Sequence, residues 1–185
     1  MGARCMTSRT LLSIEQYDAL PEKEGFKYEL NEGELVTVSP SPRLVHNRVR
    51  DEIGFRLREY VRSRQLGEVT METDFKLTEG TIRIPDVAFV CADRLVGIDP
   101  RERLEGAPDL AVEVASPRDD PDDLVLKAQQ YVAAGARAVW IIYPEARLAY
   151  IYKPGQRPEV RDVRQSLDDP ELLPGFSAPL SAILK

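Results

Sequence analysis

The sequence predicts a mixed α/β domain in which a partly antiparallel sheet is flanked by helices. Two observations lead to this prediction: segments whose apolar residues recur at helical spacing, and several short apolar runs typical of strands. The composition agrees, because 43% hydrophobic and 30% charged residues are typical of a globular protein. We expect a single domain over residues 11–185, preceded by a disordered N-terminal extension at residues 1–10.

The first part of the chain carries signals for a short helix, two strands and a long helix. Ser13 is a suitable N-cap for a helix in "TLLSIEQYDALPE", and Pro21 ends it. In "FKYELNEGELVTVSP" two short strands flank a tight turn at residues 31–33. A long helix is then expected from about residue 44 to 64. Its apolar stripe consists of Val49, Ile53, Leu57 and Tyr60.

The second part of the chain combines strands with one further helix. "EVTMETDFKL" and "IRIPDVAFV" are expected to form a hairpin through Glu79 and Gly80, and residues 92–107 a loop. "DLAVEVA" is the next strand, and "DDPDDLVLKAQQYVAAGA" a capped helix with Gly135 at its end. Two strands, "AVWIIYP" and "LAYIYKP", precede a polar strand near residues 158–165 and a closing segment "LLPGFSAPLSAIL".

Charge and cysteine content limit the functional classes. The net charge of −6 argues against a general nucleic-acid coat protein, but residues 43–65 carry seven arginines against three acids. This excess is either a solvated helix face or a patch facing phosphate, with Arg43, Arg48 and Arg50 as candidate contacts. We expect no membrane span and no signal peptide, because no apolar segment is long enough. Two isolated cysteines favour neither a disulfide framework nor a zinc site, so we expect a cytoplasmic protein.

Two acids stand in apolar strands. "PDLAVEVASP" places Glu113 within a run typical of a strand buried on both faces, where an ionised carboxylate is costly unless paired or bound to a metal. Asp86 in "RIPDVAFV" is the second acid. On adjacent strands the two can converge on Mg²⁺ or Mn²⁺, with the Val114 backbone carbonyl as a further ligand. The alternatives are an ion pair between Glu113 and Arg83 and a strand-end aspartate at position 86.

Three further polar residues lie on helix faces that should turn inward. Lys127 shares a stripe with Leu124 and Tyr131, so it either extends its ammonium group to solvent or points it at the acids. In the second case it could orient a water or neutralise charge in a transition state. Gln130, one turn further, is a candidate to support it. His46 lies on the apolar stripe of the long helix and either reaches the site or is a satisfied core histidine.

The motifs, taken in order, resemble a known family. "YELNEGEL", a histidine early in the long helix, "IPDVAFV", "PDLAVEVASP" and "K…Y…AGARAVWIIYP" are similar to the Uma-two family, a branch of the PD-(D/E)XK nuclease superfamily. The resemblance runs from about residue 12 to the end, where "PGFSAPLSAIL" resembles the family's closing segment. It implies a restriction-endonuclease-like fold, with a mixed β-sheet flanked by helices, and an endonuclease activity.

The resemblance also implies roles for individual residues. Asp86 is similar to the superfamily's metal-binding aspartate and Glu113 to its second acid. Lys127 resembles the catalytic lysine, here displaced to the helix. Glu29, in "YEL", resembles an additional acid contributed by the N-terminal part of the domain.

One position departs from the superfamily pattern. The lysine is expected two residues after the second acid, and this chain has Ala115 there. Asp74 and Lys76, in "TDFK", have the right spacing, but they precede Asp86 instead of following it. The strand order is therefore wrong for this pair to be the site.

Together these observations predict a Mg²⁺- or Mn²⁺-dependent endonuclease that hydrolyses DNA phosphodiester bonds. The alternative is a catalytically inactive nuclease-fold module that binds nucleic acid or a protein partner, which Ala115 and the acidic net charge favour. Leu44 and Phe55 lie opposite the apolar stripe of the long helix. We expect them to be exposed and to mark a contact in a homodimer or higher homo-oligomer.

Overall fold

A six-stranded mixed sheet forms the centre of the computed structural model, which describes residues 11–21, 26–38 and 43–185. The expected extension at residues 1–10 lies outside this part of the chain. The strand order is β11-β10-β9-β8-β6-β3, and every neighbouring pair is antiparallel except β8 and β9. The strands are β3 (Gly67–Met71), β6 (Val87–Cys91), β8 (Leu110–Val114), β9 (Ala138–Tyr143), β10 (Leu148–Tyr152) and β11 (Glu159–Asp162).

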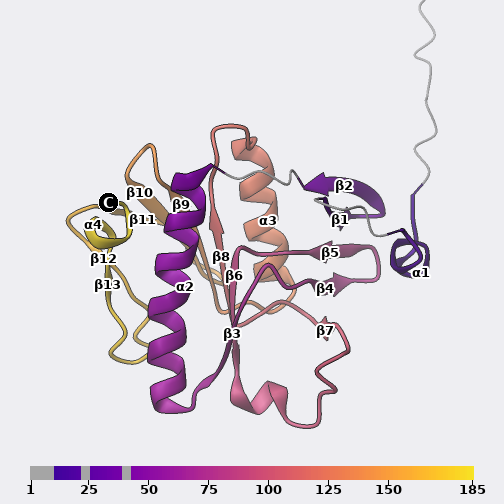
Figure 1. Cartoon of the computed structure of the whole chain (residues 1–185), viewed down its shortest axis with the longest axis horizontal. Helices are drawn as coiled ribbons and strands as arrows, with labels where there is room; N and C mark the ends of the chain where they lie inside the picture. Colours follow the sequence, from indigo (N-terminus) through magenta and orange to yellow (C-terminus); the bar gives the residue numbers. More distant parts are fainter. Residues whose placement is uncertain (1–10, 22–25, 39–42) are drawn as a thin grey trace, which may run out of the picture.

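Two helices cover opposite faces of this sheet, α2 (Leu44–Arg64) and α3 (Pro121–Ala133) (Figure 1). Successive side chains of a strand point to opposite faces. In β8, Val112 accordingly packs in the cluster under α2, whereas Ala111 packs in the cluster under α3. The same alternation puts Glu113 on the α3 side, which determines which groups it can meet.

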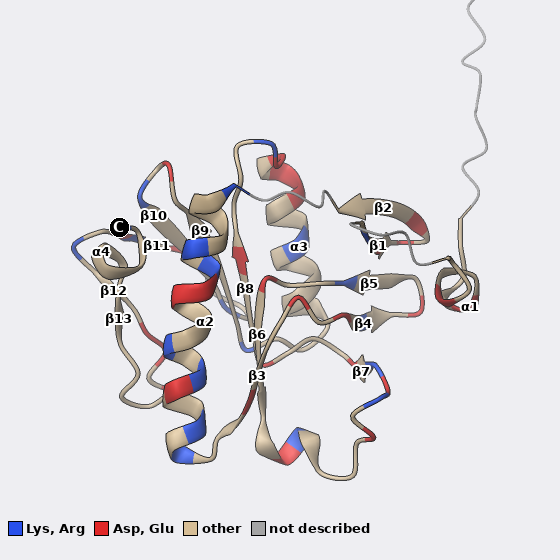
Figure 2. Ribbon diagram, in the orientation of Figure 1, with Lys and Arg blue, Asp and Glu red and all other residues tan. Residues whose placement is uncertain are grey.

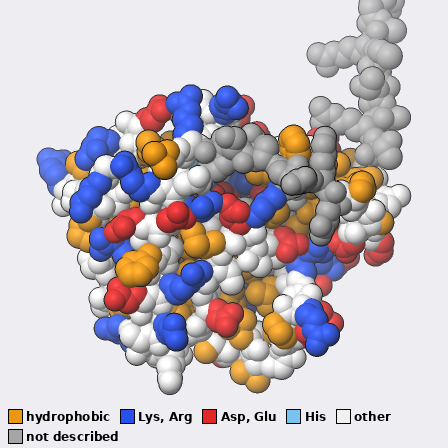
Figure 3. Space-filling model, in the orientation of Figure 1, with side chains coloured by type: hydrophobic (Ala, Val, Ile, Leu, Met, Phe, Trp, Pro, Cys, Tyr) orange, Lys and Arg blue, Asp and Glu red, His pale blue; other side chains and the backbone are white. Residues whose placement is uncertain are grey.

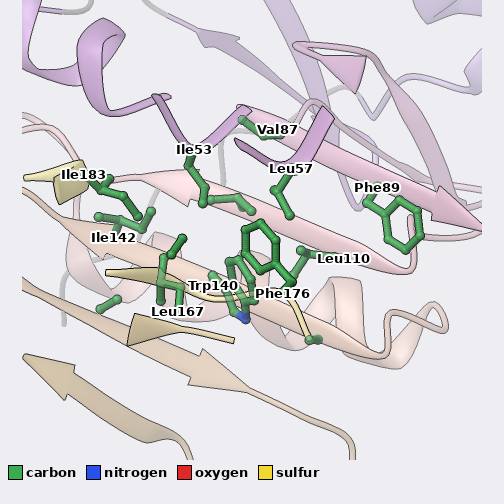
Figure 4. Packing of buried hydrophobic residues seen from close by; sticks show 14 of the residues in the cluster. Ile53, Leu57, Val87, Phe89, Leu110, Trp140, Ile142, Leu167, Phe176 and Ile183 are labelled. Carbon is green, nitrogen blue, oxygen red and sulfur yellow. The ribbon is translucent and has the colours of Figure 1, made fainter. Parts of the chain in front are cut away.

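The larger core lies between α2 and the sheet. Ile53 and Leu57 of the predicted apolar stripe are fully buried there, in the same cluster as Trp140 (Figure 4). The C-terminal segment closes this core with β12 (Ser166–Leu167), β13 (Ala178–Pro179) and α4 (Leu180–Ile183). The predicted helix over residues 44–64 is confirmed with the same bounds. It is stable here because its apolar stripe packs against the apolar face of the sheet.

A second, five-stranded sheet has the order β2-β1-β5-β4-β7. Its strands are β1 (Lys27–Asn31), β2 (Glu34–Val38), β4 (Phe75–Thr78), β5 (Thr81–Arg83) and β7 (Leu104–Glu105). The predicted hairpin through residues 79 and 80 exists, but only as β4 and β5. Each predicted long strand is divided between the two sheets, since β3 and β6 pair in the central sheet. Pro85 stands at one of the two breaks, where a residue without an N–H cannot continue a ladder.

The short connections follow the local chemistry of the chain. Glu32 and Gly33, between β1 and β2, both have positive φ, as a two-residue hairpin turn requires. Helix α1 (Ile14–Asp18) begins at Ser13, whose side chain accepts a hydrogen bond from the amide of Gln16. The predicted loop at residues 92–107 also contains a 3₁₀ helix, η1 (Ala92–Leu95), and strand β7. None of the helices in the described residues combines the length and apolar character needed to cross a membrane.

Candidate active site

Glu113 lies in β8, and Asp86 directly precedes β6, the antiparallel neighbour of β8. Val87 of β6 lies opposite Val112 of β8, and the same register continued by one residue brings Asp86 opposite Glu113. The amide of Val114 donates a 2.7 Å hydrogen bond to Oδ2 of Asp86, which ties the two strands together at this point. Asp86 therefore stands directly before a strand and, in the backbone, opposite the second acid.

Glu113 is enclosed beneath α3, with 5% of its surface exposed. The Tyr131 hydroxyl donates a 2.9 Å hydrogen bond to Oε1 of Glu113, and Nζ of Lys127 lies 3.6 Å from the same oxygen. Burial raises the pKa of the Glu113 carboxyl group to about 7. The Lys127 ammonium opposes this rise, and the nearby Asp86 carboxylate adds to it.

Glu29, on β1, is buried and has cations at both oxygens. Arg83 lies 2.9 Å from Oε2, and Lys127 lies 2.9 Å from Oε1. The Ile84 amide donates a further 3.0 Å hydrogen bond to Oε1. Burial alone would raise the pKa of Glu29, but the two cations outweigh it and hold that pKa below its usual value. The contacts of Glu29 thus serve to hold Lys127 and Arg83.

Lys127 brings its ammonium group between the two buried glutamates rather than extending it into solvent. Burial by itself would lower the pKa of Lys127, yet the carboxylates of Glu113 and Glu29 together hold that pKa above its usual value. Lys127 projects from helix α3. Asp120 caps the start of this helix and Pro121 is its first residue, and both stabilise the turn from which the helix continues to Lys127.

Arg83 and Gln130 support the pair of Glu29 and Lys127. Arg83 donates from Nε to Oε1 of Gln130 at 2.9 Å, and Gln130 donates from Nε2 to Oδ1 of Asn31 at 2.8 Å. Arg83 is thus the partner of Glu29, and the alternative ion pair between Arg83 and Glu113 is not formed. Gln130 lies behind Lys127, where it links α3 to the second sheet.

His46 reaches the site from α2. Its Nε2 atom lies 3.3 Å from Oδ2 of Asp86, while Nδ1 is buried and has no hydrogen-bond partner among the described residues. Burial alone would lower the pKa of His46, but the contact with Asp86 reverses the effect and raises that pKa. His46 is therefore not a core histidine satisfied at both nitrogens.

The three candidate phosphate-binding arginines differ in their surroundings. Arg50 pairs with Glu72 and Asp51, so its charge is already compensated. Arg43 lies 3.7 Å from Glu145. Arg48 is exposed and has no ion pair with the described residues. Figure 2 shows basic and acidic residues interspersed along α2, and most of them are at least partly exposed, so the outer face of this helix carries charges of both signs.

The second acid–lysine pair, Asp74 and Lys76, belongs to the periphery. Asp74 pairs with Arg103, and Lys76 lies 2.9 Å from Glu79 and 3.2 Å from Glu105. Both side chains are thus used in surface ion pairs.

The ligand set fits a hard divalent cation that retains water molecules. Among the described residues no group of three or more His, Cys, Asp or Glu side chains could hold a metal ion. Two carboxylates are enough for Mg²⁺, which is commonly held by one or two carboxylates plus water and substrate phosphate. The contacts given above use only Oδ2 of Asp86 and Oε1 of Glu113. A metal ion would also relieve the repulsion that helps to raise the pKa of Glu113.

Sequence reasoning missed the supporting contacts. It placed Tyr131 on the inward stripe of α3 but did not pair it with Glu113, and it gave Asn31 no role. A signal was available: residues 111 and 113 share one face of β8, and Tyr131 lies on the helix stripe that covers that face. The Val114 amide is in use, and its carbonyl as a metal ligand stays a prediction.

Comparisons with known proteins bear on the fold and on the family of the chain. A crystal structure described as a putative nuclease belonging to DUF820, from Anabaena variabilis ATCC 29413, matches with a TM-score of 0.83 and 18% identity. The match covers 94% of this chain and 97% of that one, which shows that the two share the restriction-endonuclease-like fold. A cryo-EM structure of a DrdV–DNA complex matches with a TM-score of 0.37 and 15% identity, over 64% of this chain and 82% of that one. No curated protein matches the chain significantly.

The family assignment rests on sequence. The pattern of the Uma2 family, described as "Putative restriction endonuclease", matches residues 14–181. This range includes Asp86, Glu113 and the helix that carries Lys127. The chain therefore belongs to the Uma2 family.

Proposed function

We propose that this protein is a metal-dependent endonuclease that hydrolyses DNA phosphodiester bonds at the site formed by Asp86, Glu113 and Lys127. The observation that carries the proposal is the position of the Lys127 ammonium, 3.6 Å from Glu113, on a helix that follows the second acid. Lys127 would take the role of the superfamily lysine, because Ala115 stands at the position where that lysine is expected. Membership of the Uma2 family supports the same reaction class.

Asp86 and Glu113 would hold Mg²⁺ or Mn²⁺, with the Val114 carbonyl as a further ligand. When bound, such a cation polarises a phosphate and lowers the pKa of a coordinated water. Lys127 would donate a hydrogen bond to the attacking water or to the phosphate oxygen on which charge develops. Glu29 would keep the lysine aimed at this point, since Nζ of Lys127 contacts both glutamates.

His46 would act beside Asp86. Its contact with Oδ2 can fix the orientation of the Asp86 carboxylate, and its other ring nitrogen is not used by the described residues. Arg83 and Gln130 would be positioning residues, because Arg83 contacts Glu29 and Gln130 contacts Arg83 and Asn31, rather than the two acids at the proposed metal site.

The test is nicking of a supercoiled plasmid with Mg²⁺ or Mn²⁺ at low salt. Glu113→Gln and Lys127→Ala are compared with two matched controls from the peripheral ion pairs, Glu105→Gln and Lys76→Ala. We expect nicking to be lost in the first two variants and kept in both controls. Nicking that survives Glu113→Gln and Lys127→Ala would refute the proposed site.

A second candidate function is a nuclease-fold module that binds nucleic acid or a protein partner without cleavage. It is favoured by Ala115 and by the engagement of Lys127 with Glu29. This candidate predicts no nicking by the unmodified protein in either metal, together with retarded migration of duplex DNA in a gel.

We also propose that the chain forms a homodimer through α2. Leu44 and Phe55 are 82% and 64% exposed, as the sequence predicted for the face opposite the buried stripe. A symmetric pair would suit the two strands of a duplex. Sedimentation equilibrium of the unmodified protein and of Phe55→Asp tests the contact, and a monomer in both samples would refute it.

A further inference from the structure

A small pocket of about 180 Å³ lies beside the first turns of α2. The helix contributes Val45, Arg48 and Val49, the turn after β9 contributes Pro144 and Arg147, and the C-terminal segment contributes Leu184 and Lys185. Figure 3 shows basic side chains gathered at the upper left of this face, in the region where Figure 1 places the start of α2 and the C-terminus.

The lining of the pocket is positively charged. Arg48, Arg147 and Lys185 are exposed, and none of the side chains that line the pocket is acidic. Glu145 follows the lining residue Pro144 in the chain. Its carboxylate lies 3.7 Å from Arg43, which does not line the pocket. Arg48 has no ion pair with the described residues, so its guanidinium is free to meet an anion.

Arg147 is held in place from one side. Its Nη1 donates a 3.0 Å hydrogen bond to the carbonyl of Leu184, and the remaining donors of the guanidinium fork are not used by the described residues. Because this hydrogen bond already restrains the guanidinium group, Arg147 loses less conformational freedom on binding a phosphate than an unrestrained arginine side chain does.

The pocket and the proposed active site share one edge of the central sheet. Strands β8 and β9 are parallel and in register, with Val114 opposite Ile142, so both end at this edge. Glu113 is the residue before the last one of β8, and the turn that carries Arg147 follows β9 directly. On α2, His46 faces Asp86 and Arg48 lines the pocket two residues later.

We propose that this pocket binds a backbone phosphate of the polynucleotide, away from the phosphodiester bond that is cleaved. The inference rests on the proposed function and adds a second contact point on the same strand. The apolar groups of Val45, Pro144 and Leu184 suit the sugar between phosphates, and the basic groups suit the phosphate itself. Arg48 and Arg147 are the residues that fix the position of the backbone.

The test is fluorescence anisotropy with a labelled duplex in EDTA, where no cleavage occurs, over a range of KCl concentrations. Arg48→Gln and Arg147→Gln are compared with Arg101→Gln, an exposed arginine of the loop between β6 and β7. Removing one phosphate-binding side chain is expected to lower the slope of log affinity against log salt by about 0.9. Arg147→Lys, which keeps the charge, is expected to recover most of the slope.

The outcomes separate this inference from the proposed function. Reduced slopes in the two variants, with Arg101→Gln unchanged, support the pocket even if the protein nicks no plasmid. Slopes equal to that of the unmodified protein, or no binding by the unmodified protein, overturn the inference and leave the nicking test to decide the function. Displacement of the duplex by inorganic phosphate at matched ionic strength would identify a small-anion site and would also overturn it.

Discussion

The ammonium group of Lys127 lies 2.9 Å from Oε1 of Glu29, although 98 residues separate the two positions in the chain. This ion pair joins helix α3, which packs on the central sheet, to strand β1 of the second sheet. It holds the lysine ammonium within 3.6 Å of Glu113, the second buried glutamate of the candidate site. The contacts around this pair, and the core that supports it, can be tested by substitution and by chemical labelling.

Removal of the Glu29 charge should destabilise the fold. Glu29→Gln leaves the buried cation of Arg83 without its carboxylate partner and leaves Lys127 with Glu113 alone. Loss of a buried ion-pair partner typically costs about 3–5 kcal/mol. We expect the free energy of unfolding, measured in urea, to fall by about this amount. Glu79→Gln, a substitution of an exposed glutamate, serves as the control. An unchanged midpoint in Glu29→Gln would contradict the network.

Loss of the Tyr131 hydroxyl should weaken metal binding. Tyr131→Phe removes the hydrogen bond to Oε1 of Glu113 without changing the shape of the buried ring. Groups that orient a metal ligand typically contribute about 10- to 100-fold in affinity. Titration calorimetry with Mn²⁺ should report a loss in this range, whereas Tyr150→Phe should bind as the unmodified protein does. Equal affinities for the two variants would exclude the orienting role.

Two positions on α2 should respond differently to truncation. Ile53 is fully buried and Phe55 is 64% exposed, although they are two residues apart. Ile53→Ala creates a cavity, which typically costs about 2–5 kcal/mol. Phe55→Ala should change the free energy of unfolding by less than about 0.5 kcal/mol. Chemical denaturation of both variants checks the orientation of the helix, and a larger loss for Phe55→Ala would show it to be wrong.

The Cys91 thiol should be unreactive at neutral pH. Burial, with a contribution from Asp109, raises the pKa of Cys91 to about 11, compared with 9.0 for an ordinary thiol. Because the thiolate is the reactive form, alkylation at pH 8 should be about a hundredfold slower than for a free cysteine. The rate should rise as the pH is increased toward 11. Iodoacetamide labelling followed by mass spectrometry, with Cys91→Ser as the control, measures it; rapid labelling at pH 8 would refute the prediction.

The local sequence pattern was sufficient to predict the helices and strands whose apolar residues follow a clear pattern. The helix over residues 44–64 was predicted because Val49, Ile53 and Leu57 recur on one face, and the structure buries these three. The strand around Glu113 was predicted from its apolar run, and the acid itself stood out because its burial requires compensation. The hairpin over residues 68–90 was predicted only in part, since the division of its strands between two sheets depends on which neighbours each half finds.

The sequence by itself determined the fold class, the family motifs and the four charged residues of the candidate site: Glu29, Asp86, Glu113 and Lys127. Only the tertiary structure decided the pairing among them. It assigned Arg83 to Glu29, Tyr131 to Glu113 and His46 to Asp86, and it engaged Arg50 with Glu72. The physical reason is that apolar periodicity is a local property of the chain. A buried charge instead selects its partner from whatever groups packing brings within a few ångströms, regardless of their separation in sequence.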